Sequence, residues 1–436
     1  MQMANTDESI GRTRWVHLVP VIFLMYTISY FDRINIGLAL PSMSKDLHLT
    51  SSNAGLAAGI FFWGYLISFL GAGYLAPRFG AKRVILTALI LWGGFAIGTG
   101  LVQNYHELLI MRFMLGLSEG PVWTSTAMLL SQWFIQRERA RAFGLWNLCL
   151  PVGAMLSGPI SGLILTYSSW HIMFIIEGLP AWLWAFIWWR QIPTSVDQAK
   201  WLPAEEKQRL QTRINAEQIE LAAGASPDWW AMLREPAVWL LMGGFSLINM
   251  VNYGFGIWLP TALKAASTLS IGYIGLVSAL PYLAAIVGLI VVTRSSDRHH
   301  ERRLHAGIPM IAIGGLLYIG SHIGAHEIVP IMIAFTVMGF FLFMYLPLIF
   351  TFTSELLPRS LAIPAMAFIG GFANLFGGFV GPWLVGWLRG VTGNVSLAFG
   401  VLAVFGILGG LLVIAIRPKR RRAVVGEIAV SQVGYR

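Results

Sequence analysis

The chain has 436 residues, of which 56% are hydrophobic and 11% are charged, and its formal net charge at pH 7 is +10. Soluble globular domains carry about 25% charged residues, so this composition excludes an ordinary soluble protein and predicts a polytopic membrane protein. The basic residues are concentrated in particular loops, and this distribution argues against a nucleic-acid-binding protein.

Twelve apolar segments follow one another along the chain, each long enough for the roughly 20 helical residues that cross a hydrocarbon core of about 30 Å. Membrane-spanning strands alternate polar with apolar residues, which these segments do not. We therefore predict an all-α integral membrane fold with 12 transmembrane helices. The segments cover residues 16–40, 54–75, 83–102, 107–129, 142–165, 171–190, 237–262, 272–292, 305–324, 328–352, 362–388 and 394–416.

The longest polar interruption, residues 191–236, divides these segments into two groups of six. Within it, Pro203 at a first turn, followed by Leu210 and Ile214 at helical spacing, predicts a short amphipathic helix on the surface of the bundle or the bilayer. We expect a cytoplasmic tail at 1–15, a six-helix bundle at 16–190, a cytoplasmic linker at 191–236, a second bundle at 237–417 and a basic cytoplasmic tail at 418–436.

The loops between the segments are basic on one side only. Of the 30 Lys and Arg residues, 25 lie in the two tails, the linker and the connections on the same side, whereas only Lys45, Lys264 and Arg389 lie in the opposite loops. Because cytoplasmic loops are enriched in Lys and Arg, we expect both termini in the cytoplasm and the chain in the cell (inner) membrane. The first segment is too long for a signal peptide and should remain as the first helix.

Two basic loops at equivalent places in the halves share a pattern. Arg78 precedes a basic pair by four and five residues, and Arg298 does the same 220 residues later. Duplication of a six-helix unit would leave such a repeat. The candidate conformational motif comprises Gly73, Arg78, Gly80, Lys82 and Arg83 in the first half and Asp297 and Arg298 in the second.

The first of these loops resembles the loop motif of the major facilitator superfamily, with Pro77 in place of its usual Asp and Ala81 in place of one basic residue. Finer motifs resemble the anion:cation symporter family, which includes sugar-acid, tartrate, phthalate and hydroxyphenylacetate transporters. They are YFDRINIG at 30–37, RFMLGLSEG at 112–120, FIIEGLPA at 174–181, AKWLPAEEK at 199–207 and GGFVGP at 377–382. The resemblance implies two pseudo-symmetric six-helix bundles and a cytoplasmic latch that Asp297 and Arg298 retain in the second half.

Two of the apolar segments are interrupted by ionisable residues: Asp32 and Arg33 in the first, and Arg112 and Glu119 in the fourth. A charge at the bilayer centre costs about 2.5–3.5 kcal/mol on insertion scales, so such residues mark candidate functional sites. Arg112 and Glu119 are seven residues apart and share one helix face with Trp123. Gly116 lies between them and leaves room for a ligand or a neighbouring helix.

Adjacent residues on a helix diverge by about 100°, so Asp32 and Arg33 face different directions. Tyr30 shares a face with Arg33, and we predict that this face lines a central cavity, with Asp32 on the packed side toward the fourth helix. As an alternative, the four charged residues form buried ion pairs that only stabilise the N-terminal bundle.

A guanidinium stays protonated and matches the geometry of a carboxylate, which favours an organic anion as the ligand. A buried carboxyl near an Arg is suited to taking up and releasing a proton, so Asp32 and Glu119 are the candidate proton-coupling residues. In the sugar-acid symporters that the chain resembles, the matching acids have this role and the matching Arg holds the substrate carboxylate. The candidate substrate-binding residues are Arg33, Arg112, Tyr30, Tyr65, Trp123, Asn249, Tyr253 and Asn374.

The second half has no comparable intramembrane charge, and an interhelical hydrogen bond is an equal alternative for its three candidates. Leu150 stands about where sugar-acid relatives often have Gln, which makes a heavily hydroxylated ligand less favoured. An aromatic or smaller carboxylate is the other possibility. Glu177 lies in a family motif, but its position near a helix start favours a structural role. The residues that could build an aromatic cavity are Trp63, Tyr65, Trp123 and Trp146.

The sequence therefore predicts a secondary active transporter that imports a small organic carboxylate by proton symport. The substrate class covers sugar acids, hydroxy and dicarboxylic acids and aromatic acids. An organic anion exchanger and a drug or metabolite efflux antiporter are the alternatives with the same fold. We expect no enzyme activity, no metal and no cofactor other than the coupling proton. The expected partners are the substrate, protons and the lipid bilayer, without nucleic acid, and we expect a monomer.

Overall fold

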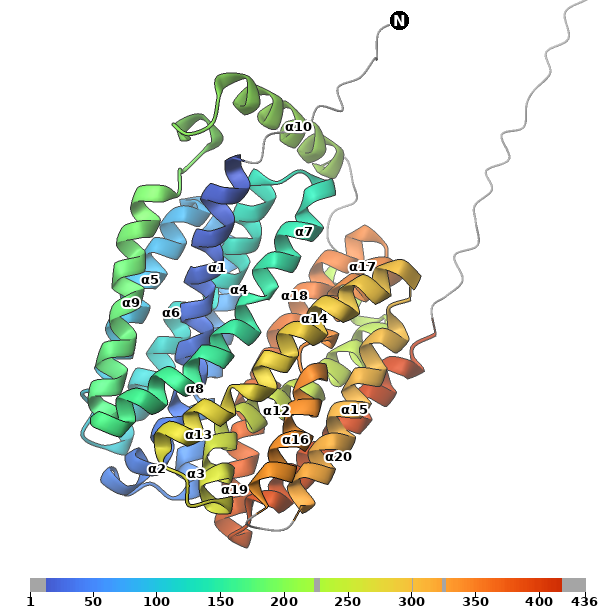
Figure 1. Cartoon of the computed structure of the whole chain (residues 1–436). Helices are drawn as coiled ribbons and strands as arrows, with labels where there is room; N and C mark the ends of the chain where they lie inside the picture. The colour runs from blue at the N-terminus through green and yellow to red at the C-terminus, as the bar shows by residue number, and fades with distance from the viewer. Residues whose placement is uncertain (1–12, 223–227, 300, 324–326, 418–436) are drawn as a thin grey trace, which may run out of the picture.

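The computed structural model describes residues 13–222, 228–299, 301–323 and 327–417. Within these ranges every regular element is a helix, and the helices form two groups that lie side by side (Figure 1). The predicted basic tail at 418–436 and most of the predicted tail at 1–15 lie outside the described residues.

The N-terminal bundle, blue to green in Figure 1, contains nine helices in the described residues because several apolar segments are interrupted. It comprises α1 (Thr13–Ile34), α2 (Ile36–Asp46), α3 (Ser51–Gly59), α4 (Phe61–Phe79), α5 (Ala81–Thr99), α6 (Tyr105–Trp133), α7 (Gln136–Asn147), α8 (Cys149–Tyr167) and α9 (Trp170–Gln191).

The C-terminal bundle, yellow to red apart from its first helix, is built in the same way. It comprises α12 (Pro236–Ala266), α13 (Ile271–Ser278), α14 (Leu280–His299), α15 (Arg303–His322), α16 (Ile328–Phe341), α17 (Tyr345–Leu356), α18 (Arg359–Leu375), the π-helical turn η2 (Phe376–Val380), α19 (Gly381–Thr392) and α20 (Val395–Ala415). Between the bundles, the linker contains the short turn η1 (Val196–Gln198), α10 (Ala204–Ala222) and α11 (Trp229–Leu233).

Eleven spans within the described residues are long and apolar enough to cross a membrane. Helix α6 is not among them, although it has 29 residues and packs against α4 and α5. It carries Glu107, Arg112 and Glu119, the last two of which are buried. The count of 12 transmembrane helices and the cytoplasmic position of the termini therefore stay predictions.

Several spans are interrupted within their length. The span Thr13–Asp46 divides at Asn35, where α1 ends and α2 begins, and the span Ser51–Phe79 divides at Ile60. Interrupted helices in transporters mark binding sites because the freed backbone groups need partners inside the protein. The break at Asn35 lies within three residues of Asp32, so the fold places the charged residues of the first segment beside a helix interruption.

The amphipathic helix expected in the linker is α10, and it lies on the N-terminal bundle (Figure 1). Leu210 and Ile214 are buried on its inner face. Glu217 forms an ion pair of 2.8 Å with Arg139 and accepts a hydrogen bond of 2.9 Å from the backbone N–H of Gln136. These contacts fix α10 to α7.

The two bundles approach most closely, backbone to backbone, at the end opposite α10, where α2, α3, α13 and α19 lie in Figure 1. A methyl group on Gly158 would come within 3.0 Å of the backbone of Gly275, and one on Gly37 would come equally close to the backbone of Ile257. Real Cβ atoms keep a larger distance, so these contacts require glycine. We call this set of close backbone contacts the glycine seal.

Candidate functional site

The centre of the N-terminal bundle holds a buried ion pair between α1 and α6. Arg33 Nε lies 2.9 Å from Glu119 Oε2, and both side chains are almost completely excluded from solvent. Ser29, one turn before Arg33, donates a second hydrogen bond of 2.8 Å to the same carboxylate oxygen. The pair therefore joins the first and fourth apolar segments.

Aromatic rings surround the Arg33 guanidinium. Its Cζ lies 4.7 Å from the centre of the Tyr65 ring, and three further rings are within 6.0 Å. Rings at this distance attract a cation through their negative faces, and the attraction grows when water is excluded. The three further rings are those of Tyr26, Tyr30 and Phe61.

Arg112 also contacts Phe61, with its Cζ 5.3 Å from the centre of that ring. It is 1% exposed, yet within the described residues nothing accepts a hydrogen bond from its Nε or Nη1 atoms. The second oxygen of Glu119, Oε1, also has no donor in the described part of the chain. A buried charge with open hydrogen-bonding positions is costly, and an anion bound at Arg112 would satisfy it.

The carboxylate of Asp32 is buried, and its hydrogen bonds go to the third apolar segment and to the end of the first. Its carboxylate accepts a hydrogen bond of 2.6 Å from Trp92 on α5 and a longer one of 3.5 Å from Asn35. It is Arg33, not Asp32, whose polar contact reaches the fourth apolar segment. The reason is that the Trp92 indole, which has a donor to satisfy when buried, occupies the position facing Asp32.

Gly116 accommodates a neighbouring helix rather than a ligand. A methyl group at this position would overlap the backbone of Phe61 on α4. On the same face of α6, Trp123 packs against Tyr26 with ring centres 5.3 Å apart and against Trp146 at 4.2 Å. The close approach of α4 to α6 places Phe61 near both Arg33 and Arg112.

The candidate residues of the C-terminal bundle form a hydrogen-bonded network. Tyr345 on α17 donates to Asn249 at 3.2 Å and accepts from Asn252 at 3.2 Å. Tyr253 donates to Asn374 at 3.2 Å. It further packs on Phe62 of the first bundle with ring centres 4.5 Å apart. Tyr253 therefore contacts both bundles.

Not every aromatic candidate lies at this centre. Trp63 is 42% exposed and packs on Phe379, so its assignment to an aromatic cavity was wrong. It precedes Tyr65 by two residues, and positions two apart on a helix point to different sides. Tyr65 is buried, as are Trp146 and Leu150.

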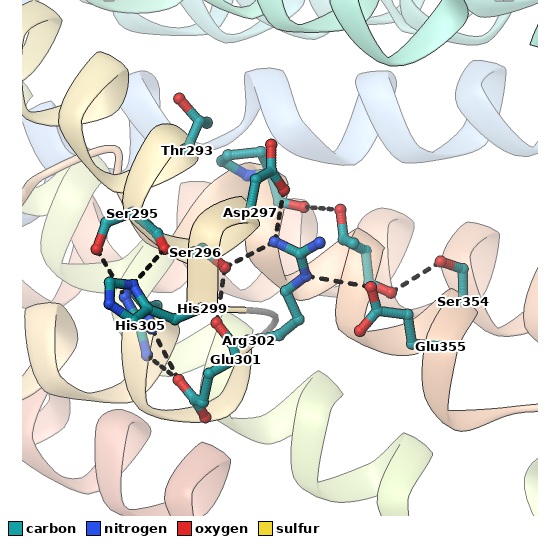
Figure 2. Close-up of polar contacts among 12 residues, drawn as sticks. Thr293, Ser295, Ser296, Asp297, His299, Glu301, Arg302, His305, Ser354 and Glu355 are labelled. Atoms are coloured by element: carbon teal, nitrogen blue, oxygen red, sulfur yellow. Dashed lines mark hydrogen bonds and ion pairs between the residues drawn. The ribbon is translucent and has the colours of Figure 1, made fainter. Parts of the chain in front are cut away.

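At the α10 end of the C-terminal bundle, Arg302 joins the ends of α14 and α17 (Figure 2). It contacts Asp297 at 2.7 Å and Glu355 at 3.1 Å, and it donates to Ser296 at 2.8 Å. Asp297 thus has a basic partner, as the motif implied, whereas the neighbouring Arg298 is exposed.

The corresponding loop of the N-terminal bundle is held differently. Gly80 has a φ of +83° between α4 and α5, a backbone conformation that favours glycine. Lys82 donates a hydrogen bond of 3.0 Å to the backbone carbonyl of Trp189, and Arg78 donates one to the Tyr74 hydroxyl. Arg83 is exposed, and a methyl group at Gly73 would meet open space. The motif residues of this half therefore make no ion pair within the described residues.

Five residues of the site were not predicted from the sequence. Tyr26 and Ser29 lie seven and four residues before Arg33, so helical spacing could have found both. The other three come from distant segments, and no local pattern relates them to the charged residues. They are Phe61, Trp92 and Tyr345.

The model of the Major Facilitator Superfamily matches residues 22–368 and 262–432 of this chain. The chain belongs to this superfamily. It is 29% identical to a quinolone resistance transporter of Acinetobacter baumannii, over 95% of this chain and 96% of the relative, and 26% identical to a hexuronate transporter of Bacillus subtilis, over 89% and 93%. These relatives make it a multi-pass membrane transporter of organic anions or metabolites, consistent with the anion:cation symporter type.

Among solved structures, the chain is similar to a bacterial homologue of the human lysosomal transporter Spinster in an inward-facing, occupied conformation. The TM-score is 0.72, and the match covers 92% of this chain and 96% of that one. Because the identity is only 14%, this similarity concerns the fold alone. It agrees with the arrangement of two bundles seen in Figure 1.

Proposed function

We propose that the protein imports a small organic carboxylate together with protons. The observation that supports this proposal is the combination of the Arg33–Glu119 ion pair with the unpartnered donors of buried Arg112. Two guanidinium groups that both lie within about 6 Å of one aromatic ring suit a ligand with a carboxylate and an apolar or hydroxylated body.

Competition for Arg33 would provide the coupling between proton and substrate. In the ion pair, Glu119 occupies Arg33 Nε, so a substrate carboxylate at this position must displace it. Protonation of Glu119 removes its negative charge and leaves Arg33 for the substrate. A carrier that has bound only the proton or only the substrate keeps a buried uncompensated charge, and this charge disfavours reorientation. Asp32, Tyr30, Tyr65 and Trp123 are proposed to support this site, and Asn249, Tyr253 and Asn374 to complete it from the second bundle.

We further propose that α6 is the twelfth transmembrane helix and that the α10 end faces the cytoplasm. The excess of Lys and Arg in the linker and tails supports this orientation. The glycine seal would then close the outer side, and the arrangement would correspond to an inward-facing state. Transport would proceed by alternating access as the seal opens and the opposite end closes.

The alternative is an organic anion exchanger or an efflux antiporter for drugs or metabolites. It is supported by the similarity to the quinolone resistance transporter. An exporter would use the same charged centre, but the proton would move inward as substrate moves outward.

Uptake into proteoliposomes tests the proposal. A panel of labelled sugar, hydroxy, dicarboxylic and aromatic acids is offered with and without an imposed gradient that is acidic outside. Symport predicts accumulation that depends on external acidity. Accumulation with the gradient reversed would support the antiporter, and exchange without any effect of the gradient would contradict proton coupling.

A further inference from the structure

Glu177 on α9 is a second buried carboxyl of the N-terminal bundle, apart from the Arg33–Glu119 pair. Its side chain is 4% exposed. Its Oε1 atom accepts a hydrogen bond of 2.7 Å from Ser161, and its Oε2 atom accepts one of 2.9 Å from Asn35. Among the described residues, no Lys, Arg or His lies within 4.0 Å of it. Its hydrogen-bonding partners are therefore neutral.

Asn35 connects Glu177 to a further acid. The same amide nitrogen, Nδ2, donates to Glu177 at 2.9 Å and to Asp32 at 3.5 Å. Asn35 Oδ1 is buried without a donor in the described part of the chain. Two carboxylates that share one amide in an apolar interior repel each other, and one proton on the pair removes the repulsion. When Glu177 carries this proton, its carboxyl group becomes a donor. A half-turn of the Asn35 amide would then place Oδ1 where it can accept this hydrogen bond.

We propose that Glu177 is a proton-binding site of the carrier, distinct from Glu119, and that it takes up and releases a proton as the transporter works. Its place in the transport cycle rests on the proposed function, but its exchange of a proton does not. A carboxyl kept only for structure would not require an amide bridge to a second acid, because apolar packing stabilises a bundle without the cost of burying a charge.

Glu177 is also one hydrogen bond away from the glycine seal and from a helix interruption. Ser161, its donor, lies on α8 between Gly158 and Gly162, which contact α13 in the glycine seal. Asn35, its other donor, stands at the break between α1 and α2. A proton on Glu177 changes the charge that both donors meet. Its protonation state is thus connected to the contact that must open when the outer side becomes accessible.

The surroundings leave Asp32 as the charged neighbour of this site. Helix α9 packs against α1, α2, α5 and α8. Among the described groups on these helices, Asp32 shares the Asn35 amide with Glu177. The other charged or titratable residues of these five helices are Arg14, His17, Tyr26, Tyr30, Arg33, Lys45, Asp46, Lys82, Arg83, Cys149, Tyr167, His171 and Arg190.

Proton counting on the substrate-free carrier tests this inference. The purified protein in weakly buffered detergent solution is brought from about pH 9 to about pH 6, a range in which an ordinary exposed Glu, with a pKa of about 4.3, binds almost no proton. We expect Glu177→Gln to take up one proton fewer per carrier than the wild type. Glu107→Gln, which changes an exposed acid of α6, is the matched control and should take up the wild-type number. If the wild type and Glu177→Gln take up the same number of protons per carrier, the inference is overturned.

Infrared spectroscopy gives an independent readout if Glu177→Gln does not fold. In Ser161→Ala the acid remains, but Oε1 loses its hydrogen bond. We expect the pH-dependent absorption of one protonated carboxyl to shift in frequency relative to the wild type. An unchanged pH-dependent carboxyl spectrum would contradict the proposal. Neither measurement needs a substrate, so failure of all labelled acids in the uptake panel would refute the proposed function without deciding the role of Glu177.

Discussion

Arg33 Nε and Glu119 Oε2 are 2.9 Å apart across α1 and α6, in a region from which water is excluded. Breaking such a pair by removing one partner leaves an unpaired buried charge, which typically costs 3–5 kcal/mol. Neutralising the acid by a proton, with a substrate carboxylate taking its place, avoids this cost. The pair is thus well suited to couple two ligands.

Glu119→Gln should abolish accumulation driven by a pH gradient while sparing exchange of substrate across the membrane. The amide has no proton to release, but it leaves Arg33 available to an anion. Uptake with an imposed gradient and counterflow without one measure the two activities separately. Accumulation at the wild-type rate in this variant would show that Glu119 is not a coupling residue.

Arg112→Lys should raise the KM for an anionic substrate by about tenfold or more, equivalent to about 1.4 kcal/mol of binding. Lys keeps the charge but lacks the planar fork that binds a carboxylate through two bonds. Arg190→Lys, at an exposed position near the end of α9 and outside the charged centre, is the control. Equal KM values for Arg112→Lys and wild type would exclude Arg112 from the binding site.

Gly116→Ala should destabilise the protein because the new methyl group would overlap the backbone of Phe61. Overpacking typically costs about 1–3 kcal/mol, and a backbone neighbour has no rotamer by which to move away. Gly315→Ala on α15 meets nothing within 4 Å and should keep or raise the stability. Melting temperatures in detergent compare the two variants, and similar values for both would contradict the close approach of α4 and α6.

Tyr345→Phe removes one hydroxyl that connects Asn249 with Asn252. Leaving buried amides unpaired costs about 1–3 kcal/mol, so a lower melting temperature is expected. If the network also contacts the substrate, the KM will rise as well. Tyr318→Phe, at a half-exposed position of α15, provides the comparison. Unchanged stability and KM would remove Tyr345 from both roles.

The pH dependence of stability should contain a contribution from Glu301, which precedes α15. Partial burial opposes its ionisation, but the backbone N–H of Leu304 and the side chain and backbone of His305 stabilise the carboxylate, and the net effect lowers its pKa. A lowered pKa in the folded state gives stability above the unfolded pKa of about 4.3. This stability is lost as the pH falls from there through the folded pKa.

In Glu301→Gln, melting temperatures measured between about pH 7 and about pH 3 should lack this part of the acid-induced decrease. The two proteins should differ most above the unfolded pKa and converge at the lowest pH. If the difference between variant and wild type stays constant over the whole range, the carboxylate of Glu301 does not contribute in this way.

The sequence was sufficient to find the charged residues, because a charge inside an apolar segment is visible without any structure. It was not sufficient to pair them. Whether Asp32 or Arg33 reaches the fourth segment depends on the rotation of α1 and on the indole of Trp92, 60 residues away. The same holds for Tyr253 and Asn374, whose contact spans 121 residues. The family resemblance supplied the arrangement of two bundles. The contacts of individual side chains could be identified only in the structure.

The glycine seal brings bare main chain of one bundle against bare main chain of the other, as at Gly158 and Gly275. Attraction between such surfaces is short-ranged, and a gap of about 0.5–1 Å already forfeits a quarter to a half of it. We therefore expect the glycine seal to be either closed or open. The carrier should spend little time in a partly open state, in which ions could leak through it.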